Sequence, residues 1–307
     1  MTQEIVLRVT PEEKLEIKKS YERTAEEISK DIVALREWLK KQPHLPQTID
    51  DVFLEMMLQR NKFSLEKTKS KLDTYFSVRN LIPEFFEDRH TLSDRMQQYM
   101  KHVTILPMPN LMKDHSRMHI LSANSPDPDL FDVTSHVKFF FALCDLRMYY
   151  DQADSETIII NCENLKFGHV LKFTPTLTKQ IFTVLSKAYS DRIKAMHFIN
   201  VNSYVVSLIS LIQSLLNDKL ASRVKSHKSL EALHEYIAKE DLPSDYQGTQ
   251  KSIAELFVEW KKFTESKDDW LVKQAEMKSN EKLRIGKFLE DDMFGSIHGS
   301  FRTLNVD

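Results

Sequence analysis

The stretch of residues 193–216 reads IKAMHFINVNSYVVSLISLIQSLL, in which a short β-rich run is followed by a long apolar run. The first run has the length and the β-branched and aromatic content of a buried strand. Drawn as a helix, residues 204–216 place Ser207, Ser210 and Ser214 in one narrow polar stripe and apolar side chains around the rest. This segment predicts a strand followed by a helix that is a core helix, a lid over a cavity or a membrane-inserting segment.

Strand-like runs alternate with helical patterns on the N-terminal side of this segment. The strand candidates are 103–106, 118–121, 157–160 and 193–199, and the helices between them cover about 130–150 and 175–189. Such alternation predicts an α/β sheet domain.

The first hundred residues carry helix start signals instead. Thr10 and Glu13 form a capping box with Pro11 at the first helical position, which predicts a helix to about residue 41. Further helices are expected to begin near Asp50 or Asp51 and after Ser64, a possible cap. We expect these helices to pack together as a small bundle.

The chain therefore divides into three parts. We expect a helical module over 1–100, an α/β domain over 101–250, and a C-terminal helix with a tail over 251–307. The C-terminal helix follows Pro243, and its apolar face carries Ile253, Leu256, Phe257, Trp260 and Phe263.

Composition and missing motifs exclude several function classes. A net charge of −2 argues against general attraction to nucleic acid, and two cysteines are too few for a disulfide framework. The sequence has no glycine-rich phosphate loop and no Gly-x-Ser-x-Gly elbow, so we expect no enzyme and no cofactor. Residues 1–8 lack a signal-peptide core, and no stretch reaches the roughly 18 apolar residues of a spanning helix. We expect a cytoplasmic protein.

The histidines give weak signals for a metal site. His115 and His119 are spaced for zinc on a helix, but their segment is predicted to be a strand, where residues four apart do not converge. His169 and His197 are expected to be structural. We predict no metal site.

Nine short segments carry a resemblance to a known family. They are LREWL (35–39), QPHLP (42–46), DVFL (51–54), KFSLEK (62–67), FGH (167–169), FTP (173–175), KAMHFIN (194–200), LPSDYQG (242–248) and FGSIHGSFR (294–302). In this order they resemble the CRAL-TRIO family of lipid carriers, in particular its alpha-tocopherol transfer protein-like branch of the insect type. The resemblance implies a CRAL-TRIO α/β lipid-binding domain after the N-terminal bundle, with an apolar pocket floored by the sheet.

The resemblance also assigns the ligand pocket. It implies that 204–216 is a mobile gate helix, and that the pocket is lined by Val137, Phe140, Cys144, Ile158, Ile160, Ile181, Val184, Leu185, Val205, Leu208, Leu211 and Ile212. Phe140 and Cys144 stand where the tocopherol carrier has serines, which favours a drier cavity and puts tocopherol in doubt. A retinoid, carotenoid, sterol or terpenoid remains an alternative ligand.

Basic residues flank the predicted gate. By resemblance, Arg192, Lys194, Lys219 and Arg223 match residues that hold phosphoinositide headgroups, whereas sequence alone equally allows a solvated helix face. A family arginine of the N-terminal module is replaced here by Asn61. We therefore expect peripheral, transient membrane contact.

Two functions remain open. The chain is either an intracellular carrier of one small hydrophobic ligand between membranes, or a phosphoinositide-binding adaptor with a vestigial pocket. A cavity under the predicted gate favours the carrier, and a filled core favours the adaptor.

Overall fold

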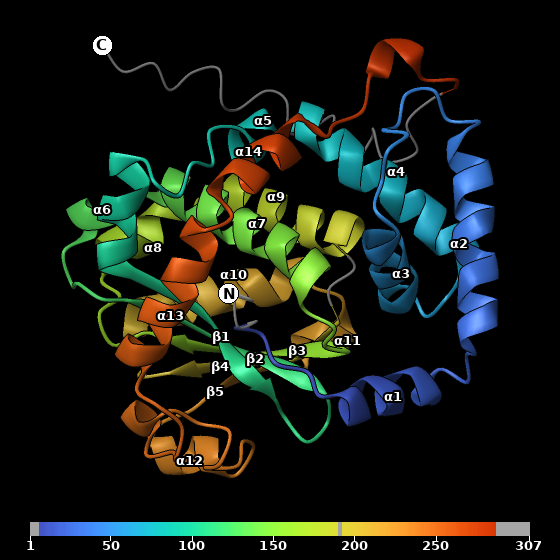
Figure 1. Cartoon of the computed structure of the whole chain (residues 1–307). Coiled ribbons are helices and arrows are strands. Elements are labelled where there is room, and N and C mark those ends of the chain that lie inside the picture. The colour runs from blue at the N-terminus through green and yellow to red at the C-terminus, as the bar shows by residue number, and fades with distance from the viewer. Residues whose placement is uncertain (1–5, 190–191, 287–307) are drawn as a thin grey trace, which may run out of the picture.

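A computed structural model describes residues 6–189 and 192–286, and its N-terminal helices stand beside a sheet-containing body (Figure 1). The helices α13 (Ile253–Glu265) and α14 (Asp268–Glu276) run back across that body toward the N-terminal helices. The family-like run 294–302 lies outside the described residues.

The N-terminal module contains more helices than the start signals predicted. They are α1 (Pro11–Ser20), α2 (Ala25–Leu39), α3 (Asp51–Arg60), α4 (Leu65–Leu81), α5 (Pro83–Phe86) and α6 (Asp94–His102). The prediction of one helix from Pro11 to about residue 41 was wrong. Glu22 adopts a positive φ of 53°, and a second capping box at Thr24 and Glu27 starts α2. Ser64 does precede α4, but its side chain makes no capping hydrogen bond.

The sheet contains five strands in the order β1-β2-β3-β4-β5 among the described residues. They are β1 (Val103–Leu111), β2 (Ser116–Ala123), β3 (Ser155–Asn161), β4 (Ile193–Ile199) and β5 (Val224–Ser226). β1 is antiparallel to β2, and the remaining neighbours are parallel. The sequence pattern missed β5, because three residues are too few to show an alternation.

Helices cover both faces of the sheet. In Figure 1, α7 (Val133–Tyr150), α9 (Pro175–Val184) and α10 (Ser203–Leu215) lie above it, and α12 (Leu230–His234) lies below. A π-helical turn, Leu185–Tyr189, continues α9, and the short helices α8 (Phe167–Lys172) and α11 (Asp218–Ala221) flank α10. An α/β domain behind a helical module is thus the fold, as the sequence predicted.

A buried carboxylate joins the module to the domain. Asp145 of α7 is fully buried and contacts Arg79 of α4 at 2.7 Å and Arg89 at 2.6 Å. The hydroxyls of Tyr75 and Tyr189 donate to it at 2.6 and 2.7 Å. Burial alone raises the pKa of Asp145, but the two guanidinium groups outweigh it and lower that pKa. The carboxylate is therefore ionised and ties α4 and the π turn to the central helix.

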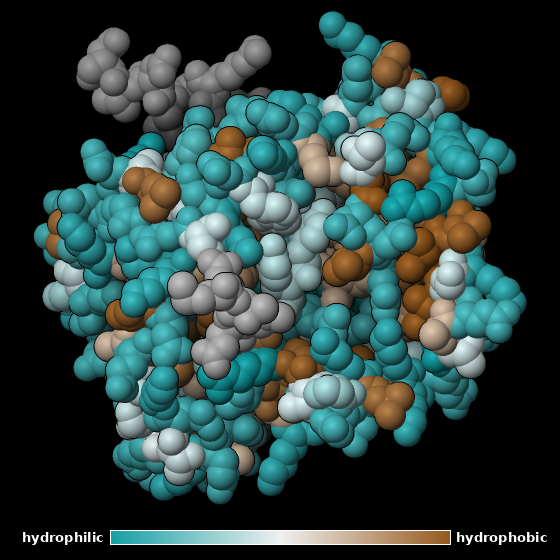
Figure 2. Space-filling model, in the orientation of Figure 1, coloured by the Kyte–Doolittle hydropathy of each residue, from teal (hydrophilic) through white to brown (hydrophobic). Residues whose placement is uncertain are grey.

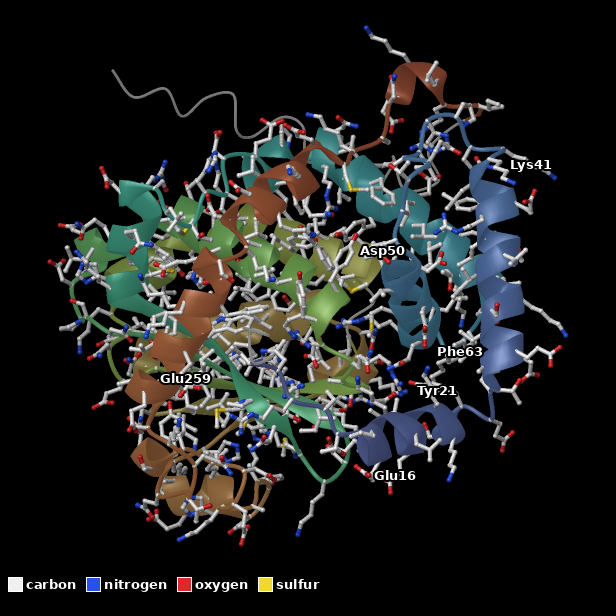
Figure 3. The ribbon with its side chains drawn as sticks, viewed as in Figure 1. Glu16, Tyr21, Lys41, Asp50, Phe63 and Glu259 are labelled. Atoms are coloured by element: carbon white, nitrogen blue, oxygen red, sulfur yellow. The ribbon has the colours of Figure 1, made fainter. Side chains whose placement is uncertain are left out.

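A second junction lies where α1 meets the sheet. The Tyr21 ring packs edge-on against Phe63 with centroids 5.4 Å apart, and both side chains are labelled in Figure 3. The Tyr21 hydroxyl donates to Asp154, which also accepts from Arg192 Nη1 at 2.7 Å. Arg192 thus belongs to a contact that holds the N-terminal helices on the domain.

Candidate functional site

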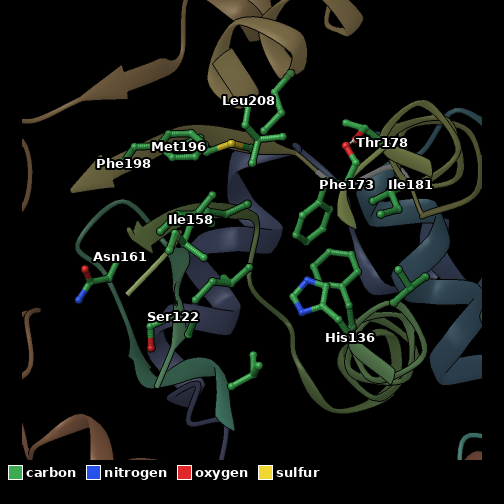
Figure 4. A pocket seen from close by; sticks show the side chains of 18 of the residues that line it. Ser122, His136, Ile158, Asn161, Phe173, Thr178, Ile181, Met196, Phe198 and Leu208 are labelled. Carbon is green, nitrogen blue, oxygen red and sulfur yellow. Dashed lines mark hydrogen bonds between the residues drawn. The ribbon is translucent and has the colours of Figure 1, made fainter. Parts of the chain in front are cut away.

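A cavity of about 180 Å³ lies between the sheet and the helices α7, α9 and α10. In Figure 4, Leu208 points from α10 toward Ile158 and Met196 of the sheet, while His136 and Ile181 enclose the other side. An engineered cavity of about 150 Å³ is large enough to hold benzene, so this space takes a ring-sized group without rearrangement. A larger ligand requires a wall to move.

Strand alternation builds the floor of the cavity. Ile158 and Ile160 of β3 point to the same face, and β4 places Met196 and Phe198 beside them in register. Leu121 of β2 pairs with Ile160 and extends this floor. The floor is apolar because the strand residues that face the cavity here, Leu121, Ile158, Ile160, Met196 and Phe198, are apolar.

The polar side chains of the wall are already engaged. His136 Nδ1 lies 2.8 Å from the Tyr99 hydroxyl, and burial lowers the pKa of His136 to about 4. The Thr178 hydroxyl donates to the Thr174 carbonyl at 2.9 Å. Asn161 Oδ1 accepts from the Asn200 amide at 3.0 Å. The cavity therefore offers a ligand mainly apolar contact.

Helix α10 is a thin cover over this space. The Asn202 side chain caps it by accepting from the Val205 amide, and the helix buries only Val205, Ile209 and Ile212. The predicted serine stripe lies on the exposed side. Lifting three buried aliphatic side chains costs about 1.5–3 kcal/mol each, or roughly 5–9 kcal/mol together. A lipid interface, where exposed apolar groups lose their hydration cost, can offset this amount.

The predicted pocket residues divide into three groups. Those that line the cavity are Val137, Phe140, Ile158, Ile160, Ile181, Leu185, Leu208 and Ile212. Cys144 lines a smaller adjoining cavity of about 50 Å³. Neither cavity is lined by Val184, Val205 or Leu211, although Val184 and Val205 are fully buried. These three residues lie outside both cavities in this structure, and their contact with a ligand stays a prediction.

The sequence reasoning also missed cavity residues. Those with the clearest sequence signal are Met196 and Phe198, which follow the same alternation in β4 that identified Ile158 and Ile160 in β3. Phe131, Phe173 and Phe182 line the cavity as well, but they come from a loop, a helix end and a helix face. No local pattern marks these three aromatic residues.

Three of the four predicted headgroup residues make contacts within the protein. Arg192 contacts Asp154, Lys194 Nζ lies 2.9 Å from an Asp114 carboxylate oxygen, and Arg223 donates to the Ile193 carbonyl. Lys219 is exposed on α11, and no described carboxylate pairs with it.

The histidines occupy separate sites. His115 sits at the turn before β2 with Nε2 3.0 Å from Glu16, whereas His119 lies buried within β2. His169 accepts from the Lys166 amide at 3.1 Å, and His197 Nδ1 lies 2.8 Å from His227 Nε2. Over 6–189 and 192–286, no three histidine, cysteine or acidic side chains gather closely enough to hold a metal ion.

Apolar side chains are exposed beside the cover helix. Phe167 and Leu171 of α8 are 57% and 59% exposed, and Val206 of α10 is 53% exposed, while α8 and α10 pack together. Within the described part of the chain, no helix is both long and apolar enough to cross a bilayer. The face seen in Figure 2 is mainly hydrophilic, with hydrophobic residues gathered over the N-terminal helices.

Two family models match the chain. The model of the CRAL/TRIO domain matches residues 99–248, and a model described as "Pinta-like, UBA domain" matches residues 24–96. These matches follow the order of the helical module and the α/β domain described above.

Curated relatives match most of the chain at low identity. Alpha-tocopherol transfer protein-like from Mus musculus and from Homo sapiens are each 25% identical over 227 residues, covering 72% of this chain and 65% of the relative. Clavesin-1 from Rattus norvegicus is 26% identical over 232 residues, covering 72% and 64%. The match therefore spans slightly less than two thirds of these relatives. Among solved structures, the crystal structure of Sfh5 gives a TM-score of 0.47 at 10% identity, covering 82% of this chain and 93% of that chain.

Proposed function

Because the CRAL/TRIO domain model matches residues 99–248, we propose that this chain carries one small hydrophobic molecule in the cavity beneath α10 and transfers it between membranes. The observation that carries this proposal is the apolar cavity of about 180 Å³ between sheet and helices. Well-packed protein cores have few voids larger than a water molecule. A cavity of this size is therefore better explained by an occupant than by imperfect packing, which favours a carrier over an adaptor with a vestigial pocket.

The energetics of ligand burial require a movable wall. A ligand that buries about 500 Å² of apolar surface gains on the order of 12 kcal/mol at about 25 cal/mol per Å². Such a ligand dissociates slowly from the protein into water unless the cavity opens. We propose that α10 is the opening wall, since it lies over the cavity and buries few residues of its own.

The surface beside α10 suits a membrane interface. Phe167, Leu171 and Val206 are exposed and can enter the lipid boundary when α10 moves. Basic side chains near an anionic leaflet contribute about 1 kcal/mol each. We propose that Lys219, with Arg192, Lys194 and Arg223, provides this attraction to phosphoinositide headgroups. Contact would be transient, from the cytoplasmic side, and the carried molecule is the only small molecule that the function requires.

Native mass spectrometry tests the carrier proposal. Purified protein is exposed to a mixed lipid extract and washed, and the retained mass is measured. The proposal expects one retained molecule per chain and its transfer to acceptor vesicles. If nothing is retained from the extract, the carrier function is wrong and the phosphoinositide-binding adaptor becomes the better candidate.

A further inference from the structure

A second, smaller cavity adjoins the apolar one and has three polar side chains set in a mainly apolar wall. Its volume is about 50 Å³, and it shares Leu121, Phe140, Ile158, Leu185 and Ile193 with the larger cavity. The remaining walls include His119 of β2, Arg147 of α7 and Glu156 of β3. A water molecule needs about 10–15 Å³ by this measure, so the space holds a small polar group.

The three polar side chains form a compact cluster. Glu156 Oε1 lies 2.8 Å from Arg147 Nη2, and its other oxygen lies 3.6 Å from His119 Nε2. Arg147 Nε also contacts Asp151 at 3.1 Å. His119 and Glu156 are 6% and 5% exposed. The cluster is thus sealed from bulk water.

His119 is the member of this cluster with an unsatisfied atom. Its Nε2 is buried and has no hydrogen-bond partner, since 3.6 Å is too long for a hydrogen bond. Burial, and then the charge of Arg147, lower the pKa of His119 to about 3, so the ring is neutral at physiological pH. A buried polar atom without a partner costs free energy, which a ligand atom can recover.

We infer that the small cavity is the polar end of the ligand site and binds a hydroxyl group of the carried molecule through His119, Arg147 and Glu156. This inference rests on the proposed carrier function and specifies the chemistry of the cargo, an otherwise apolar alcohol. The apolar body of that molecule occupies the larger cavity.

A hydroxyl fits this cluster better than other small polar groups. It donates to Glu156 or accepts from Arg147, and it pairs with His119 Nε2 in either tautomer of the ring. A carboxylate would bring a second negative charge beside Glu156, whose own pKa is lowered because the nearby guanidinium groups, Arg147 first, outweigh its burial. A carbonyl oxygen accepts but cannot donate. The alcohol is the group that satisfies all three side chains.

The test compares one lipid extract before and after acetylation, which blocks hydroxyl groups and leaves carboxylates free. Native mass spectrometry measures retention by the wild-type chain and by His119→Leu and His119→Gln. We expect the wild type to retain the free extract about tenfold better than the acetylated one, as for a buried hydrogen bond to a charged group. His119→Leu should show a clearly smaller preference, because it loses one of the three hydrogen-bonding partners, and His119→Gln, which keeps a hydrogen-bonding group, should resemble the wild type.

Several results would overturn the inference. Equal retention of both extracts by the wild type contradicts it and leaves the carrier function standing. The same preference in His119→Leu as in the wild type means that His119 does not bind the hydroxyl, which contradicts the inference. Retention from neither extract by the wild type rejects the carrier function itself.

Discussion

Leu208 and Leu211 provide a matched pair for testing the cover helix. Both are half-buried leucines of α10, but Leu208 lines the cavity and Leu211 does not. Alanine is at least as favourable as leucine within a helix, so neither Leu208→Ala nor Leu211→Ala should disturb α10 itself. A difference between the two variants therefore reports on the ligand.

The expected difference follows from buried area. Complete burial of a leucine side chain stabilises by about 1.5–3 kcal/mol. The ligand covers only part of half-buried Leu208, so removing this side chain should weaken ligand binding by about 1 to 1.5 kcal/mol. A free-energy change of about 1.4 kcal/mol corresponds to a tenfold change in the dissociation constant, so this constant should rise roughly five- to tenfold. Leu211→Ala should change it less than about twofold, as expected for a residue outside the ligand contact.

Ligand dissociation provides the assay. The molecule that the wild type retains from a lipid extract is loaded on each variant, and its loss to excess vesicles is followed by native mass spectrometry. Thermal unfolding of the unloaded variants checks that both folds are equally stable. Equal weakening by the two substitutions, or a larger effect at Leu211, would refute the assignment of the cavity-facing side of α10.

Three further expectations concern stability and docking. Asp145→Asn leaves two buried guanidinium groups without their carboxylate, so the free energy of unfolding should decrease by about 3–5 kcal/mol in thermal or denaturant titration. A decrease of less than about 1 kcal/mol would mean that this junction contributes little to stability. Arg192→Glu should lower both the unfolding midpoint and delivery to phosphoinositide vesicles, whereas Lys219→Glu should lower delivery alone and spare neutral vesicles. Burial, with His227 and Lys225, lowers the pKa of His197 to about 4. Between pH 6.5 and 4 the unfolded chain binds a proton at this position that the folded protein does not. The free energy of unfolding should therefore decrease by up to about 3 kcal/mol as the pH is lowered through this range. His197→Gln should flatten the stability profile across this window, and an unchanged slope argues against a neutral buried ring.

The strand part of the site was predictable because a strand has a period of two. Once Ile158 was assigned to the pocket face, Ile160 followed, and both line the cavity. Helix faces are harder to predict, because each residue turns by about 100° and a small error in rotation exchanges neighbours. This explains why Leu208 and Ile212 line the cavity while Leu211, between them in sequence, does not.

The polar end of the site could not be inferred from the sequence. His119, Arg147 and Glu156 come from two strands and one helix, and they meet only through the register of β2 and β3 and the packing of α7. In the sequence, His119 stands out only as a possible zinc-binding partner of His115, four residues away. Spacing along the chain says little about groups that a parallel sheet brings together from separate strands.

The contacts of the basic residues change how docking should be understood. Lys194 pairs with Asp114 at the surface, and such exposed pairs are worth about 0–1 kcal/mol, so a phosphate can replace the carboxylate at little cost. Arg192 is different, since Asp154 and Tyr21 both hold it at the junction with α1. A headgroup that takes Arg192 must weaken that junction. Because Lys219 has no such competitor among the described residues and lies on the helix that follows α10, the first headgroup contact should form there, beside the wall that has to open.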